Sequence, residues 1–162
     1  MAGSVSSAAI MNEDQQQTSH KWHAIECNNL AWALSEKSER TPTEDAEMLS
    51  AAHASAFHWA KVGTETNVAR AQMLVAHVSA FLGHGDLAMA AAHECREKLA
   101  SEDVPDWEAA FIEAIHAHAH YAAGEMERFS KIYAKAAELG AAIAGEEDRK
   151  IFEATFNGIP KP

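Results

Sequence analysis

The spacing of hydrophobic and polar positions predicts helices along most of the chain. Apolar residues recur every three or four positions, and no run alternates apolar and polar residues as a half-buried strand does. After position 17 the chain is rich in Ala, Leu and Glu and has no stretch dominated by Val, Ile and Thr. We therefore expect an all-α protein. The polar, Gln-rich segment over 1–17 lacks periodicity, so we expect a disordered tail there.

Start and stop signals divide the periodic part into about seven helices. Thr41, Pro42 and Glu44 fit a helix start, because they can form a capping box with proline in the first turn. Gly63 is expected to end that helix in the left-handed conformation, and Thr64 to cap the next one. The predicted helices cover about 18–37, 42–61, 66–82, 86–100, 105–123, 126–144 and 147–156.

Two joints between these helices have similar sequences. FLGHGDLAMAAAHECREKL begins at Phe81 and YAAGEMERFSKIYAKAAEL begins at Tyr121, and each has an aromatic residue, a glycine and an acid before an Ala-rich helix. Gly85 and Gly124 are 39 positions apart, and a two-helix period of this length is typical of an α-solenoid. We therefore predict a single domain over 18–162, built as a right-handed α-solenoid of antiparallel helix pairs. The extra first helix covers 18–37, and the pairs cover about 42–82, 86–123 and 126–157.

The repeated joints resemble those of tetratricopeptide (TPR) repeat proteins. The matching positions are Tyr121, Gly124, Glu125, Phe129, Tyr133, Ala136 and Ala137, with a second copy at Phe81, Gly85, Asp86 and Ala90. The segments AHASAFHW and VGTETNVAR are also similar to small bacterial TPR-like proteins without assigned activity. The units are longer than the usual ~34 residues, and the first opens with Thr-Pro instead of the Gly-acid joint. The resemblance implies a groove, lined mostly by the first helix of each pair, that binds a peptide or helix of a partner.

Charge and motifs narrow the class of function. The net charge is −11 and no Lys/Arg cluster occurs, which argues against binding to nucleic acid or to anionic membranes. No apolar run reaches ~18 residues, no secretory signal pattern is present and the two cysteines are far apart, so we expect a cytoplasmic protein. No nucleophile, phosphate-loop or zinc-protease motif occurs. We expect no catalytic activity and no cofactor.

Four residues are candidates for partner binding. Arg70 and His77 are seven positions apart and so lie on one flank of the third predicted helix. A guanidinium among apolar residues needs a carboxylate, supplied either by this chain or by an acidic side chain or C-terminus of a partner. Trp59 and His53 extend this tentative surface. His53 also shares an apparent apolar face with Phe57, where a histidine is most often a hydrogen-bonded core side chain.

The segment EAIHAHAHYAAGE at 113–125 suggests a metal site as the alternative function. Glu113, His116 and His120 lie on one stripe of a helix, a spacing found in half of many metal sites. His118 falls instead on the face marked by Phe111 and other apolar residues. We therefore expect the stripe to point away from the core, as a solvated or groove-lining surface.

Three functions remain open from the sequence. The leading hypothesis is a protein-interaction module that binds a peptide or helix of a partner through Arg70, His77, Trp59 and His53. The alternative is a metal-binding helical protein, possibly an enzyme, that uses the histidine-rich face. The third is a homo-oligomer, for which Trp22 and Trp32 in the helix over 18–37 supply large apolar side chains.

Overall fold

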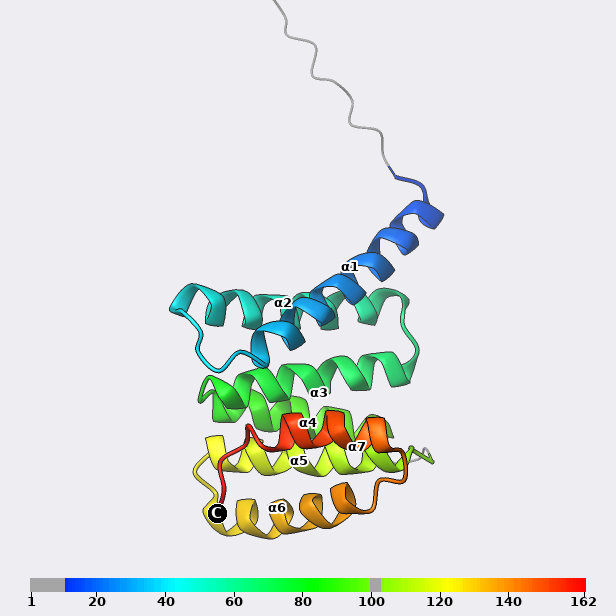
Figure 1. The fold of residues 1–162 in the computed structure, drawn as a ribbon. Coiled ribbons are helices and arrows are strands. Elements are labelled where there is room, and N and C mark those ends of the chain that lie inside the picture. Colours follow the sequence, from blue (N-terminus) through cyan, green and yellow to red (C-terminus); the bar gives the residue numbers. More distant parts are fainter. Residues whose placement is uncertain (1–10, 100–102) are drawn as a thin grey trace, which may run out of the picture.

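The computed structural model describes residues 11–99 and 103–162, which form seven α-helices and no strand. The helices are α1 (Glu13–Ser35), α2 (Pro42–Val62), α3 (Glu65–Phe81), α4 (Gly85–Leu99), α5 (Asp106–Ala122), α6 (Met126–Ala141) and α7 (Glu146–Phe156). The all-α class is therefore confirmed for the described residues. Figure 1 shows the helices stacked from α1 and α2 at the top to α6 at the bottom.

The first helix begins earlier than predicted because of an asparagine cap. The Asn12 side chain accepts a hydrogen bond from the Gln15 backbone N–H (2.9 Å), and the Gln15 side chain accepts one from the Asn12 N–H (3.0 Å). This capping box starts α1 at Glu13, so 13–17 are helical and not part of a disordered tail. Residues 1–10 of the predicted tail lie outside the described part. The predicted caps at Thr41 and Thr64 are confirmed.

Two of the helix ends use glycine in the left-handed conformation. Gly83 follows α3 with φ +73° and Gly124 follows α5 with φ +77°. Gly63 does not, contrary to expectation: its φ is −86° and its ψ is 166°. Gly63 is followed directly by Thr64, the N-cap residue of α3, which has extended backbone as N-cap residues do. Gly63 and Thr64 therefore form a short extended link between α2 and α3. A Cβ at Gly63 would lie 2.7 Å from the Trp59 carbonyl oxygen, which leaves no room for a side chain.

Contacts between helices follow two regular series. The most extensive contacts join α1 to α2, α3 to α4 and α5 to α6. The odd-numbered helices also touch one another in order, as α1 with α3, α3 with α5 and α5 with α7. The predicted pairs over 42–82, 86–123 and 126–157 correspond to α2 with α3, α4 with α5 and α6 with α7. The most extensive contacts instead pair α1 with α2, so α1 is the first member of a pair and not an extra helix. Helices α3 and α5 each contact four other helices, and α5 has the larger set of buried residues.

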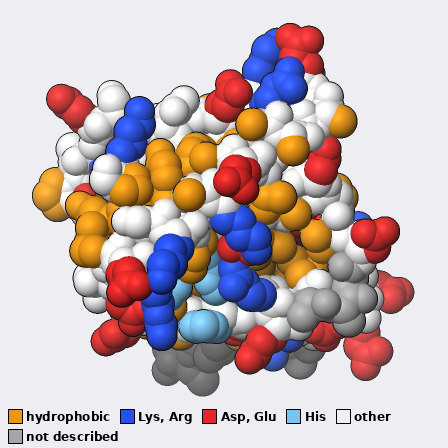
Figure 2. All heavy atoms as spheres, turned by 90° about the horizontal axis from the view of Figure 1, so that it is seen from below, with side chains coloured by type: hydrophobic (Ala, Val, Ile, Leu, Met, Phe, Trp, Pro, Cys, Tyr) orange, Lys and Arg blue, Asp and Glu red, His pale blue; other side chains and the backbone are white. Residues whose placement is uncertain are grey.

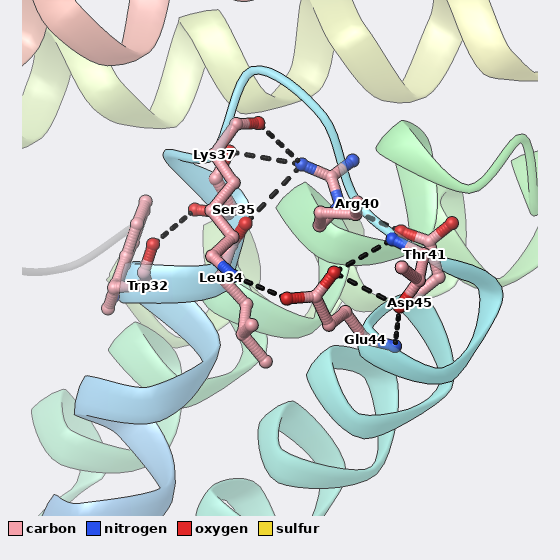
Figure 3. Close-up of polar contacts among 8 residues, drawn as sticks. All are labelled: Trp32, Leu34, Ser35, Lys37, Arg40, Thr41, Glu44 and Asp45. Carbon is pink, nitrogen blue, oxygen red and sulfur yellow. Dashed lines mark hydrogen bonds and ion pairs between the residues drawn. The ribbon is translucent and has the colours of Figure 1, made fainter.

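Arg40 holds the connection between α1 and α2 in place (Figure 3). Its Nε donates to Asp45 at 2.7 Å, and Nη1 donates to the carbonyl oxygens of Leu34, Ser35 and Lys37 at 3.2–3.4 Å. Leu34 and Ser35 belong to the last turn of α1, where intrahelical donors are no longer available, and Lys37 follows the C-cap residue of that helix. The guanidinium also lies 5.4 Å from the Phe81 ring centroid, which ties the connection to α3.

Gly140 allows α7 to pack closely on α6. A Cβ at Gly140 would lie 2.7 Å from Cδ1 of Phe152 and would also collide with Cε1 of this buried ring. We expect Gly140→Ala to lower the free energy of unfolding by about 1–3 kcal/mol, because overpacking at a rigid ring outweighs the gain in helix propensity. Urea denaturation measures this change. A double-mutant cycle with Phe152→Leu should recover much of the loss, whereas stabilisation by Gly140→Ala alone would contradict the close packing.

Candidate functional site

A hollow of about 460 Å³ lies along the odd-numbered helices, and we take it as the candidate functional site, called the groove below. Helix α1 and its C-cap residue, α3, α5 and α7 supply all of its lining residues. These are Asn28, Trp32, Glu36, Arg70, Met73, Trp107, Phe111, Asp148, Ile151 and Thr155. The volume falls within the range of small-molecule pockets, roughly 300–1,000 Å³, and suits one or two large side chains.

The floor and walls of the groove are mostly apolar and aromatic. Trp32 is half-buried and packs against the His77 ring, with ring centroids 4.9 Å apart and the ring planes tilted by 33°. Phe111 is buried and packs edge-on against Trp107 at 6.2 Å. Ile151 on α7 is 60% exposed, so a large apolar side chain stands open to solvent at this site. Such aromatic and aliphatic side chains favour contact with an apolar group of a ligand.

Arg70 is held at the groove by a buried carboxylate. Its Nε and Nη2 donate to the two oxygens of Glu108 at 2.7 and 3.0 Å, in the forked geometry that suits guanidinium and carboxylate. Glu108 is only 1% exposed, and the guanidinium carbon lies 5.4 Å from the Trp107 ring centroid. The sequence left open whether Arg70 pairs within the chain or with a partner. The internal ion pair is present in the structure, and binding of a partner by Arg70 stays a prediction.

Two acidic side chains border the groove and have no counter-charge among the residues that the structure describes. Glu36 lies at the end of α1 and Asp148 in the first turn of α7. Within the described part of the chain, neither carboxylate forms an ion pair or a side-chain hydrogen bond. The charge of Arg70 is balanced by Glu108. The groove therefore combines an apolar interior with an acidic border.

The structure separates the four residues proposed for partner binding. Arg70 lines the groove, and His77 lies buried behind Trp32. Trp59 and His53 belong to α2 and do not line the groove. The apolar face inferred for His53 is wrong, because His53 is exposed. Helix α2 instead buries Met48, Ala51, Ala52 and Ser55.

His77 and His118 form a buried pair that connects α3 to α5. Their ring centroids are 6.2 Å apart, and both side chains are 2% exposed. Burial, followed by the neighbouring His118 and Arg40, lowers the pKa of His77 to about 3. Burial lowers the pKa of His118 to about 4. Each Nδ1 lacks a hydrogen-bond partner among the described residues, so an N–H at that atom has no acceptor there.

The stripe of Glu113, His116 and His120 is buried, so its predicted solvated position is wrong. His116 Nε2 donates to the Ala92 carbonyl oxygen at 2.8 Å, and burial followed by the Arg96 charge lowers its pKa to about 4. His120 Nδ1 lies 2.8 Å from a Glu125 oxygen. The error arose because α5 packs on helices all around it, so polar residues on its opposite face are also enclosed.

Glu113 already has two cationic partners. Its oxygens accept from Arg96 at 2.9 Å and from Lys135 at 2.7 Å, which joins α4, α5 and α6. Figure 2, which views the molecule from the α6 end, shows Lys and Arg side chains beside histidine side chains on this surface. Among the described residues, no three His, Cys, Asp or Glu side chains converge as they must to hold a metal ion. Metal binding by Glu113, His116 and His120 stays a prediction that these contacts do not favour.

A second group of histidines joins α1 to α2. His20 Nδ1 and His58 Nδ1 lie 2.7 Å apart, which is the distance of a shared hydrogen bond. The ring of His23 stacks on that of His58, with centroids 5.2 Å apart. Burial, followed by the charges of His20 and His23, lowers the pKa of His58. These contacts fix the upper part of α1 on α2.

Sequence reasoning missed most of the groove. The sequence identified Arg70 as a candidate, but gave no reason to group it with Trp107, Phe111 and Ile151, which belong to separate helices. The signal that could have found them is the alternation of helices, because every second helix in a regular stack faces the same side. The acids Glu36 and Asp148 carry no local signal, since 24 acidic residues occur in the chain.

Comparison of the chain with protein-family models, with curated proteins and with solved structures found no match. Within the described residues, no helix combines the length and the apolar character needed to cross a bilayer.

Proposed function

We propose that this chain is a protein-interaction module, a right-handed TPR-like α-solenoid whose groove binds a peptide or helix of a partner protein. Two features support the solenoid. Helices α3, α5 and α7 begin 41 and 40 residues apart, close to the period seen in the sequence. The odd-numbered helices contact one another in series, which is how the first helices of successive repeats pack in a stack.

The composition of the groove carries the proposal of partner binding. Four helices that are distant in sequence each contribute side chains to one hollow. Its apolar residues include Ile151, a large side chain that is 60% exposed in the groove. They also include aromatic side chains of the kind that anchor interfaces. A groove of this size accommodates one or two side chains of a peptide, not a whole protein domain.

Selection from a displayed library of random peptides tests this function. We expect peptides to be selected that bind the whole chain at about micromolar Kd. Their affinity should fall about tenfold or more in Ile151→Ala, which removes exposed apolar contact, and in Thr155→Trp, which fills the hollow. Titration of fluorescent peptides measures the change.

Leu87→Ala provides the matched control. Leu87 is an exposed apolar residue of α4 and does not line the groove, so its truncation should leave peptide affinity unchanged. Failure to select any peptide, or equal sensitivity to Leu87→Ala and Ile151→Ala, would overturn the proposal.

Self-association is a second candidate function, because α1 exposes large apolar residues. Trp22 is 58% exposed, and Ile25 and Leu30 are each 40% exposed. The N-terminal part of α1 also extends beyond the other helices (Figure 1). The homodimer proposed through 18–37 predicts a doubled mass in light scattering that Trp22→Ser returns to the monomer value. Trp32 does not contribute to this surface, because it lines the groove.

A further inference from the structure

We propose that the ligand of the groove is a cationic peptide segment, in which a large apolar side chain is flanked by lysine or arginine. This inference rests on the proposed function and assigns the chemical class of its partner. The apolar side chain would enter between Trp32, Phe111 and Ile151. The flanking cations would pair with the acidic border of the groove.

The charges at the groove favour a cation over an anion. Glu36 and Asp148 are its only lining acids in the described chain, and Arg70 is its only lining base. Because Glu108 balances Arg70, the charge that remains for a ligand is that of the two carboxylates. An acidic segment would meet repulsion from both, with no unbalanced cation in the lining to compensate.

Arg70 itself shows how the groove accepts a cation. Its guanidinium lies over the Trp107 ring and against a carboxylate, so aromatic and acidic groups together stabilise its charge. A lysine or arginine of a ligand would find the same combination at Trp32 and Glu36 of the groove. On α7, Asp148 supplies a carboxylate and Ile151 an aliphatic surface that can cover the stem of such a side chain.

The net charge of the whole chain also favours a cationic ligand. The net charge is −11, so long-range attraction accelerates the approach of basic segments and slows that of acidic ones. The net charge attracts a cation to any part of the surface, whereas Glu36 and Asp148 attract it to the groove. The experiment must therefore separate the effect of the groove from the effect of net charge.

A single selected peptide, remade with three sets of flanking residues, tests the inference. The tightest groove-dependent peptide from the random library is synthesised with its flanks changed to all lysine, all serine or all glutamate. We expect the lysine form to bind about tenfold or more tightly than the serine form, and the glutamate form to bind more weakly than both. Raising the salt from about 0.05 M to about 0.5 M should reduce the lysine advantage.

Paired neutralising variants locate the effect in the groove. Glu36→Gln with Asp148→Asn should remove most of the preference for lysine flanks, because both substitutions keep side-chain shape and remove charge. Glu47→Gln with Glu138→Gln changes the net charge equally, at exposed positions of α2 and α6, and should leave the preference intact.

The outcomes separate the two proposals. Serine or glutamate flanks that bind as tightly as lysine, or equal losses in both pairs of variants, overturn the cationic ligand while the groove remains a binding site. If no groove-dependent peptide is selected, the proposed function fails and the cationic ligand fails with it.

Discussion

Acidification from neutral pH is expected to unfold this protein at about pH 4–5, because three buried histidines resist protonation in the fold. The pKa of His77 is lowered to about 3, and those of His116 and His118 to about 4. In the unfolded chain an imidazole has a pKa of about 6.5. Between these values the unfolded state binds more protons than the folded state, so stability falls as the pH falls.

The size of this effect follows from proton linkage. Each histidine contributes a slope of up to about 1.4 kcal/mol per pH unit between its unfolded and its folded pKa, and none above about pH 7. A single domain is stable by only about 5–15 kcal/mol, so three such groups are enough to unfold it in mild acid. Urea denaturation followed by circular dichroism, repeated across this pH range, measures the slope.

Replacement of the buried pair should make the protein more resistant to acid. In His77→Leu with His118→Leu, the midpoint of acid unfolding should move down, because neither position binds a proton in either state. Stability at neutral pH should change little or rise, since the double variant removes two buried nitrogens that have no hydrogen-bond partner among the described residues. His53→Leu, at an exposed position, is the control and should leave the midpoint in place. Equal midpoints for the double variant and the control would show that these histidines do not set the acid limit.

Arg70→Met is expected to lower the free energy of unfolding by about 2–4 kcal/mol, because it leaves the Glu108 carboxylate buried without its partner. Glu108 is 1% exposed and accepts both hydrogen bonds of the guanidinium, while Arg70 itself is half-exposed. For a domain of this length, the melting temperature should fall by about 5–15 °C. Differential scanning calorimetry at neutral pH measures it.

Two further variants identify the cause of this loss. Adding Glu108→Leu to Arg70→Met should recover much of the stability, since an apolar pair replaces an isolated buried charge. Lys131→Met breaks an exposed pair with Glu127 and should have a much smaller effect. A loss from Lys131→Met as large as that from Arg70→Met would rule out burial of Glu108 as the cause.

Local signals in the sequence predicted the helices well, because caps and glycines act within a few residues. The capping box at Thr41 and Glu44 and the turn at Gly124 were recognised from residue type and spacing alone. The start of α1 was missed because the cap is completed by glutamine at Gln15, in a stretch that also has the composition of a disordered segment. Gly63 was misread because its conformation depends on the cap that follows it.

Which side of each helix is buried was harder to predict, because burial depends on helices that are distant in the sequence. His116 and His120 lie opposite the apolar face of α5, and only the packing of α4 and α6 against that side encloses them. His53 shares a face with Phe57, yet both are exposed, since α2 presents a different side to α1 and α3. The groove was missed for the same reason, because it is assembled from four separated segments.

The position of α7 has a consequence for the order in which the protein is synthesised. Three lining residues of the groove, Asp148, Ile151 and Thr155, belong to this helix, and it docks through Phe152 against Gly140. Helices α1, α3 and α5 are synthesised before α7, so the groove of a nascent chain is incomplete until α7 has docked. Ligand binding therefore requires synthesis through α7, because a chain truncated before this helix lacks a wall of the site.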